Sequence, residues 1–568
     1  MGGFEPPQAP GWRTDLLSLV TCALLASIYC VTSASQLGAT VDEPDYVQLG
    51  MVRWRTGRHN LFVNAGIMPL SSEVQSLPLY LVELVRREPF DVTNDLAHYL
   101  PWARANNLVF LWTLLVYGGW LGRQLGGKWG GRLVIAFLAC EPNLLAHASL
   151  ATTDLSLATC LLALLAHYRD GRVNAWAKWR WRVGLPLLFA ALTFLAKASA
   201  IAFAPLVLFA VELERLVQLF RSDSTEGRPV WQRLGHFLRT ALLDGGQVLG
   251  GGFLLALLYF GFGSGNSFRG EWAQTYQPHG LIGHALWQIN QFLHSNALGA
   301  ITFQMQHQEQ GHGGSLLLGY WYPDGVWYYY PVALAIKLCL PLLLSTGLIA
   351  LVNLRALANS VFTAALLLLA FSLTCRVQLG IRLFLPIVPL LVVAVAAAMP
   401  AMVRQAREVY QRRLFLAWTV SAVCWTLVNT LAVWPHSLCF ANELAGGPAR
   451  NNLNLGDSGH DWGQGLPELL AWQLDHTETP LCIWYFGRDP NLNTSPVTPI
   501  TLTDVPVDIA ESRLRGRYLA VSTTLLYGGP GQSPLGEHLR AMQPIGQTMT
   551  FRIYDFTCPP AGRPDNTR

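Results

Sequence analysis

The sequence predicts an all-α polytopic membrane protein that carries a small α/β domain at its C-terminal end. Three observations predict this fold class: the composition, a series of long apolar segments, and a polar C-terminal stretch. Of the 568 residues, 52% are hydrophobic and only 13% are charged, whereas soluble domains have roughly 25% charged residues. A water-soluble chain of this length would need several domains with far more charged surface, so the composition excludes that class.

The first apolar segment covers about Leu16–Ser33, close to the roughly 20 residues that a helix needs to cross a bilayer. Ser33-Ala34-Ser35 resembles a signal-peptide cleavage site. The acidic Asp15 and the length of the apolar run nevertheless favour a retained anchor. Further apolar segments are residues 108–121, 133–168, 183–214, 241–262, 331–351, 361–399 and 414–434.

Three of these segments, 133–168, 183–214 and 361–399, are too long for one span. Each is interpreted as a hairpin of two helices, so that the chain is expected to cross the membrane about 11 times. The hairpin tips carry ionisable residues, and such residues in a membrane segment usually face a polar cavity or a partner. Snorkelling of single Lys or Arg side chains to the lipid headgroups is the alternative.

Lys and Arg are distributed unevenly between the segments that connect the spans. Nineteen of the 39 basic residues lie in 86 residues of short connections, namely 1–14, 121–132, 169–182, 215–240, 352–358 and 401–413. Only 16 lie in the 262 residues of the longer stretches 42–104, 263–328 and 436–568. Because cytoplasmic loops are rich in Lys and Arg, we expect a plasma (inner) membrane protein with a cytoplasmic N-terminus and an extracytoplasmic C-terminus. The net charge of +4 is too small to indicate a nucleic-acid partner.

The predicted domains are a membrane domain over 1–435, with outer loops at about 42–104 and 263–328, and a soluble domain over 436–568. In the soluble domain, GQGLPELLAWQL has helical spacing, whereas LCIWYFG, RYLAVSTTLLYG and TMTFRIYDF have the pattern of strands. The first outer loop is expected to form short interfacial helices. The aromatic residues of the second loop, in EWAQTYQPHG and GYWYPDGVWYYYP, fit either an interfacial belt or a platform for sugar rings. Cys439, Cys482 and Cys558 allow at most one disulfide in the polar region.

Two carboxylates follow the first span directly, Asp42 and Glu43 in the motif VDEPDY. Acids often begin a solvated loop, which is one interpretation. The other is that a carboxylate at the low-dielectric edge of a bilayer has a tunable pKa and acts as a general base. The hairpin tips add Asp154 in LATTD, Lys197 in FLAKAS, and Arg376 with Arg382 in CRVQLGIR.

These motifs together resemble a known superfamily. VDEPDY, EPNLLAHASLATTD, LAKAS and GIRLFLPIVP, in this order, are similar to the membrane-embedded glycosyltransferases of the GT-C fold. The resemblance is to the protein O-mannosyltransferase and lipid A aminoarabinose transferase superfamily, glycosyltransferase family 39. HGGSLLLGYWYPDGVWYYYPVALAIK and FANELAGG…LGDSGHDWGQGL resemble its bacterial branch.

The resemblance implies a hexosyl- or pentosyltransferase that takes a sugar from a polyprenyl-phosphate-linked donor and transfers it, with inversion, to an acceptor on the extracytoplasmic face. The acceptor is a protein, a lipid or a polysaccharide. Asp42 matches the proposed base, Glu43 its usual neighbour and Asp154 the second acid. The donor phosphate would be held by Arg382, Lys197, Lys337 and Arg376. Some relatives bind a divalent metal, but no His-rich ligand set is found here, and no cofactor is predicted.

Two other function classes stay open at this point. A transporter or flippase for lipid-linked saccharides would place ionisable residues near the membrane midplane, whereas here they gather at one face. A polymerase or ligase of lipid-linked glycans shares the same carrier chemistry. The chain has no Walker, Rossmann, zinc-finger or HExxH pattern, so nucleotide-driven chemistry is not supported.

Overall fold

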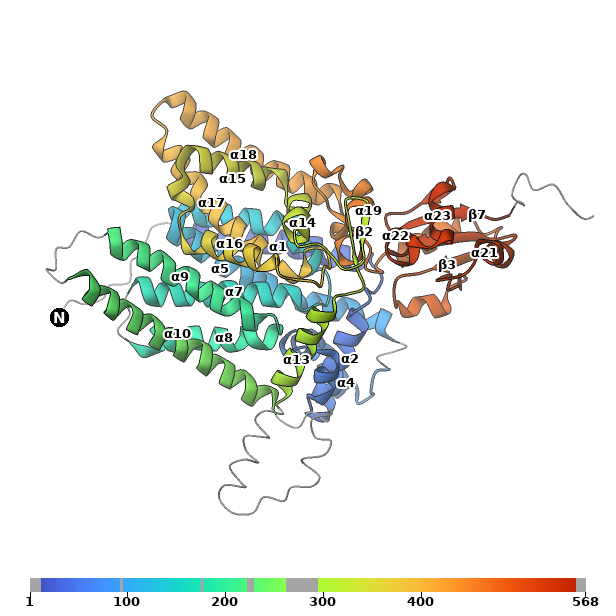
Figure 1. Cartoon of the computed structure of the whole chain (residues 1–568), viewed down its shortest axis with the longest axis horizontal. Helices are drawn as coiled ribbons and strands as arrows, with labels where there is room; N and C mark the ends of the chain where they lie inside the picture. The colour runs from blue at the N-terminus through green and yellow to red at the C-terminus, as the bar shows by residue number, and fades with distance from the viewer. Residues whose placement is uncertain (1–11, 92–94, 175–177, 222–228, 262–294, 558–568) are drawn as a thin grey trace, which may run out of the picture.

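The computed structural model describes residues 12–91, 95–174, 178–221, 229–261 and 295–557. A bundle of long helices makes up one part, and a small sheet with short helices makes up the other, at the C-terminal end of the chain (Figure 1). This architecture confirms the predicted fold class. We call the end of the bundle beside the sheet its domain end.

The helices of the bundle correspond to the predicted apolar segments. They are α1 (Trp12–Ala34), α5 (Leu96–Cys140), α7 (Asp154–Val173), α8 (Leu185–Ala196), α9 (Ala200–Arg221), α10 (Val230–Phe260), α15 (Leu340–Asn353), α16 (Ser360–Ser372), α17 (Ile387–Gln405) and α18 (Val409–Ala432). Five stretches in the described part of the chain are long and apolar enough to cross a membrane: α1, α10, Leu340–Leu357, α17 and α18. The chain is a membrane protein, and the count of 11 spans stays a prediction.

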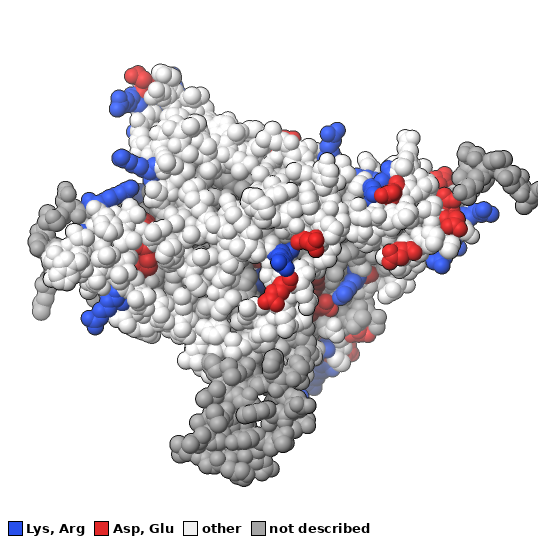
Figure 2. Space-filling model, viewed as in Figure 1, with Lys and Arg blue, Asp and Glu red and all other residues white. Residues whose placement is uncertain are grey.

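Charged side chains are sparse over the middle of the bundle. On the face that Figure 2 shows, a broad surface carries no Lys, Arg, Asp or Glu, with mostly basic and a few acidic side chains at the end of the bundle away from the sheet and charges of both signs at the domain end. Such a belt is what a bilayer requires, because a charged side chain facing lipid is costly.

Each predicted hairpin forms two helices with a charged connection. Segment 133–168 becomes the end of α5, the short α6 (Pro142–Ala148) and α7; Lys197 separates α8 from α9; and residues 373–386, with a 3-10 turn at Arg382–Phe384, separate α16 from α17. In contrast, the basic stretch 121–132 is a tight reversal within α5 at Gly127, whose φ of 75° favours glycine. The neighbouring Gly126 packs so closely on Ala397 that a Cβ would lie 2.1 Å from its carbonyl oxygen.

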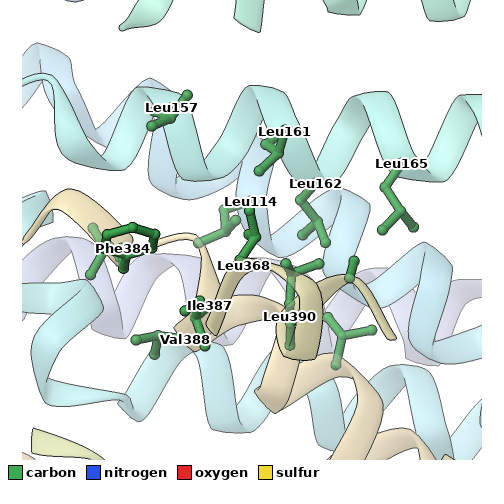
Figure 3. Close-up of a cluster of buried hydrophobic side chains, with 14 of the residues drawn as sticks. Leu114, Leu157, Leu161, Leu162, Leu165, Leu368, Phe384, Ile387, Val388 and Leu390 are labelled. Atoms are coloured by element: carbon green, nitrogen blue, oxygen red, sulfur yellow. The ribbon is translucent and has the colours of Figure 1, made fainter. Parts of the chain in front are cut away.

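A buried cluster of leucine side chains joins α5, α7, α16 and α17. Leu157, Leu161 and Leu165 follow one another at helical spacing along α7 and belong to the same buried cluster as Leu368 and Leu390 (Figure 3). In a bilayer the lipid tails are as apolar as leucine, so close packing rather than removal from water holds these helices together. This packing fixes the start of α7 beside the start of α17, where the candidate site lies.

The described loops at the domain end contain short helices. The predicted first outer loop contains the helices α2 (Glu43–Thr56), α3 (Asn60–Ala65) and α4 (Pro69–Arg86). Their position at the membrane interface stays a prediction. The described part of the second loop forms α13 (Asn296–Gln310), an antiparallel hairpin of β1 (Ser315–Leu317) and β2 (Tyr320–Tyr322), and α14 (Tyr329–Lys337). The predicted aromatic segment EWAQTYQPHG lies outside the described residues, so the two interpretations of this loop stay open.

The C-terminal domain contains a five-stranded sheet in the order β4-β3-β5-β7-β6. Strands β3, β4 and β5 are parallel, whereas β7 pairs antiparallel with β5 and β6. The strands are β3 (Leu481–Trp484), β4 (Thr498–Pro499), β5 (Tyr518–Ser522), β6 (Gly546–Gln547) and β7 (Phe551–Asp555), with helices α20 (Leu466–Leu474), α21 (Val507–Leu514), α22 (Thr523–Tyr527) and α23 (Pro534–Ala541).

The predicted helix at GQGLPELLAWQL is α20, and the three predicted strands contain β3, β5 and β7. One detail differs. The apolar run after β5 leaves the sheet as α22, because the chain turns at Ser522 into a short helix. Before α20 lie α19 (Asn451–Asn454), which packs on β1 and α22, and several 3-10 turns, of which Ser437–Cys439 packs on α6. The division at residue 436 stays a prediction. The nine described cysteines are free, and Cys558 lies outside the described residues.

Candidate active site

Asp42 ends the irregular segment that follows α1 and is the residue before α2. An Asp at this position usually caps the helix by accepting from a backbone N–H, but the Asp42 side chain makes no such bond. Its Oδ2 instead accepts from Nη2 of Arg382 at 2.8 Å and from the hydroxyl of Tyr46 at 3.2 Å. Oδ1 has no hydrogen-bond partner in the described part of the chain, and the side chain is 32% exposed. One carboxylate oxygen is therefore free to take a proton.

Asp154 lies on the other side of Arg382, at the first residue of α7. It is fully buried, and the positive end of the helix favours its charge. Nζ of Lys197 donates to its Oδ1, while Nε of Arg382 lies 3.5 Å and Nδ1 of His147 lies 3.7 Å from its Oδ2. The hairpin tips of α5–α7, α8–α9 and α16–α17 thus meet at one point.

Arg382 connects the two acids. Only 6% of this residue is exposed, and a charge so deeply buried must be paired to be tolerated. Nη2 of its guanidinium group lies 2.8 Å from Asp42 and Nε lies 3.5 Å from Asp154, and the guanidinium carbon lies 4.1 Å from the ring centroid of Trp462. The carboxylates of Asp42 and Asp154 therefore form a compact cluster with the cations of Arg382 and Lys197, and the four formal charges cancel.

Glu43 lies beside the cluster but is fully buried and fully bonded. Its carboxylate accepts from Nε and Nη2 of Arg104 at 2.8 and 2.6 Å and from the backbone nitrogens of Thr40 and Ala151. Arg104 also donates to the carbonyl oxygens of Ala34, Leu37 and Gly38. This ion pair fastens the end of α1 to α5 and to the start of α7. The geometry favours a positioning role for Glu43 over direct catalysis.

The other two predicted phosphate ligands do not join the cluster through any described contact. Nζ of Lys337 donates to the carbonyl oxygens of Leu438 and Gly459 at 2.7 and 2.9 Å, which holds the C-terminal chain against α14. Arg376 is exposed and donates to the carbonyl oxygen of Glu309 at 3.2 Å. Both contacts are structural, so the geometry supports Arg382 and Lys197 rather than these residues as anion ligands.

Sequence reasoning missed Tyr46, His147 and Trp462. The first two had a signal: Tyr46 lies four residues after Asp42, one helical turn along α2, and His147 stands in the same hairpin tip as Asp154. Trp462 had no local signal, because only the tertiary fold brings it to Arg382. Among the described residues, no group of three His, Cys, Asp or Glu side chains could hold a metal ion.

No protein-family model and no curated protein matches this chain. Among solved structures, it is similar to ArnT from Cupriavidus metallidurans in the apo state, with 15% identity and a TM-score of 0.43 over 95% of this chain and 97% of that one. The structure of ArnT from the same organism bound to undecaprenyl phosphate has 14% identity and a TM-score of 0.41, over 96% of this chain and 98% of that one.

A third similar structure is archaeal oligosaccharyltransferase AglB from Archaeoglobus fulgidus in complex with an inhibitory peptide and a dolichol-phosphate. It has 11% identity and a TM-score of 0.44, over 97% of this chain and 76% of that one. ArnT and AglB both have the GT-C fold. This is the fold of the glycosyltransferases whose motifs the sequence resembles. These likenesses leave the activity of this chain to be inferred from its own residues.

Proposed function

We propose that this protein is a membrane glycosyltransferase that moves a sugar from a polyprenyl-phosphate-linked donor to an acceptor hydroxyl on the extracytoplasmic face, with Asp42 as the general base. One observation carries the proposal. The partly exposed carboxylate of Asp42, which has a free oxygen, lies 2.8 Å from the buried Arg382. A second cation, Lys197, pairs with Asp154, which lies on the other side of Arg382.

The reaction needs a base and an anion site close together. The acceptor hydroxyl gives its proton to Oδ1 of Asp42 as its oxygen forms a bond to the anomeric carbon. On the opposite face of that carbon, the bond to the phosphate oxygen breaks, and the carrier phosphate leaves with the electron pair. Fixed cations stabilise this developing charge, and Arg382 and Lys197 supply them. Attack opposite the leaving group inverts the anomeric configuration.

The donor class rests on the motif resemblance, and the geometry supports it. The cluster lies at the ends of apolar helices, where a lipid-anchored phosphate would reach it while its prenyl chain stays among lipid tails. A transporter for the same lipids would be expected to hold its ionisable groups near the midplane. The gathering of four charged side chains at the domain end therefore favours the enzyme.

The test is incubation of the purified protein with synthetic polyprenyl-phosphate hexoses and pentoses, with and without candidate acceptors. Release of the carrier phosphate that depends on an acceptor supports transfer. Asp42→Asn should abolish it, whereas the matched control Asp45→Asn should not. Asp45 lies three residues away on α2, and its pair with Arg488 is exposed, with the two side chains 51% and 61% accessible. Movement of intact donor across vesicles without cleavage would support a flippase instead.

A further inference from the structure

One loop of the C-terminal domain, Asp457–Gly465, lies between the two segments that supply Asp42 and Arg382. On one side, the backbone nitrogen of Val41 donates to the carbonyl oxygen of Trp462 at 3.0 Å, and that of Gly38 donates to Gln464 at 2.9 Å. On the other side, Oγ of Ser458 donates to the carbonyl oxygen of Leu379 at 3.1 Å. This loop, the 457–465 loop, therefore contacts both halves of the candidate site.

The fit of the 457–465 loop against the Arg382 segment is close. A Cβ added to Gly380, whose φ is 53°, would lie 2.7 Å from the backbone of Gly459. Gly463 has a φ of 92°, and a Cβ there would lie 2.7 Å from the carbonyl oxygen of Phe486. A side chain at Gly380 would push the loop away from the Arg382 segment, whereas one at Gly463 would clash with Phe486 inside the C-terminal domain and move the loop off the sheet.

The sheet holds the 457–465 loop from behind. Asp461 is fully buried, and its carboxylate accepts from the backbone nitrogens of Gly463 and Thr524 and from the hydroxyl of Thr523. The hydroxyl of Thr524 donates back to the carbonyl oxygen of Asp461 at 2.7 Å. Because α22 begins directly after β5, the position of the loop is tied to the sheet itself.

Trp462 carries the contact to the site. Its side chain is 1% exposed, and its ring lies under the guanidinium group of Arg382 at 4.1 Å from ring centroid to guanidinium carbon. A stacked ring fixes the plane of a guanidinium group and leaves every N–H free for other partners. In this plane, Arg382 reaches Asp42 with Nη2 and faces Asp154 with Nε.

We propose that Trp462 is a positioning residue of the active site, through which the C-terminal domain orients Arg382 toward the donor phosphate. The role of Arg382 in donor binding rests on the proposed function. The C-terminal domain then contributes to donor binding, because without the ring of Trp462 the guanidinium group of Arg382 can rotate away from the phosphate.

The test compares two substitutions in the full-length protein. Trp462→Phe keeps an aromatic face under Arg382, so the KM for the donor should stay within about threefold of wild type. Trp462→Leu keeps an apolar side chain but removes the face, and the KM for the donor should rise at least tenfold while the KM for the acceptor is unchanged. Trp472→Leu is the control, because Trp472 stacks on His476 in the same domain and touches no residue of the site in the described chain.

The outcomes separate positioning from a merely structural role. An unchanged donor KM in folded Trp462→Leu overturns the proposal. So does an equal loss in Trp462→Leu and Trp462→Phe, because a ring-specific contact predicts rescue by phenylalanine. Should Trp462→Phe fail to fold, Trp462→Tyr gives the same comparison.

A second measurement does not depend on the reaction. If the wild type transfers no sugar, the proposed function fails, and a double-mutant cycle of Trp462→Leu and Arg382→Gln in thermal melting tests the contact alone. Melting shifts that are not additive support the coupling of the two residues. Additive shifts overturn it.

Discussion

Arg382 donates to Asp42 at 2.8 Å, although 340 residues separate the two along the sequence. The pair joins the segment after the first span to the tip of the α16–α17 hairpin. It also places the negative charge of Asp42 beside the proposed phosphate site, so the carboxylate and a phosphate are two anions attracted to the same guanidinium group.

Arg382→Lys should raise the KM for the donor about tenfold while the protein still inserts and folds. A lysine has one ammonium group and no planar fork, so it cannot face Asp42 and Asp154 at once or stack on Trp462 in the same way. Steady-state kinetics over a range of donor concentrations checks this. Unchanged donor kinetics would remove Arg382 from the phosphate site.

Glu43→Gln should lower stability more than it lowers catalysis. Breaking a buried ion pair by removing one partner costs about 3–5 kcal/mol, and Arg104 would keep its charge among backbone carbonyls. The measurement is the denaturation midpoint in detergent together with kcat of the folded fraction. Glu83→Gln is the control, since its pair with Arg55 is partly exposed and is worth about 0–1 kcal/mol. A normal midpoint combined with lost turnover would make Glu43 catalytic.

The acids and bases of the cluster were predictable because each interrupts an apolar segment or ends one. Asp42, Asp154, Lys197 and Arg382 stand out for that reason, and hairpin tips on one face must lie near one another. Which of two arginines in a tip faces inward was not predictable: Arg376 and Arg382 are six residues apart, and only the packed fold exposes one and buries the other.

Contacts between distant segments had no signal in the sequence. The partner of Glu43 is Arg104 on α5, and the ring under Arg382 comes from the C-terminal domain. Lys337 was expected in the site from the motif resemblance, yet it donates to two carbonyl oxygens. Local patterns identify a buried charge but do not identify its partner.

The positive-inside distribution predicts that Asn174 and Asp475 lie on opposite sides of the membrane. Both residues are exposed, so Asn174→Cys and Asp475→Cys should each be tolerated. In intact cells or sealed vesicles of known orientation, a membrane-impermeant maleimide should label only the Asp475→Cys protein. The unsubstituted protein gives the background of its native cysteines. Labelling of both variants from the same side would contradict the predicted topology.

His460 should make the protein less stable in acid. Burial lowers the pKa of His460 from 6.5 to about 3, and the nearby positive charges of Lys337 and Arg552 act in the same direction. Between these two pH values the unfolded chain binds a proton that the folded chain does not. The stability contributed by neutral His460 is therefore complete above pH 6.5 and falls as the pH drops toward 3.

His460→Gln removes this titration and keeps a side-chain N–H for the carbonyl oxygen of Met549, to which Nε2 of His460 lies at 3.0 Å. The free energy of unfolding of the His460→Gln variant should therefore fall less steeply than that of the wild type as the pH drops below 6.5, by up to about 1.4 kcal/mol per pH unit. Denaturation midpoints of both proteins at pH 7, 6, 5 and 4 check the difference. Parallel curves would show that His460 is solvated or charged in the folded protein.

Asp42→Asn should abolish transfer and at the same time strengthen binding of the carrier phosphate. The amide cannot take the acceptor proton, and a positioned base typically contributes about 10²–10⁴-fold, so kcat should fall by that factor. The same change removes the negative charge that competes with phosphate for Arg382. A charge pair at a partly exposed position is worth about 1 kcal/mol, so the Kd for undecaprenyl phosphate should fall about fivefold.

These two effects together distinguish a base paired with a phosphate ligand from a solvated loop start. Loss of turnover with unchanged carrier affinity would keep Asp42 as the base and place the phosphate away from Arg382. Tighter carrier binding with normal turnover would support Arg382 as the phosphate ligand but show that Asp42 is not the base. Asp154→Asn would then be the next variant to measure. If Asp42→Asn changes neither turnover nor carrier affinity, VDEPDY is an ordinary helix start. Asp45→Asn, on the exposed side of α2, is the control and should have no effect in either assay.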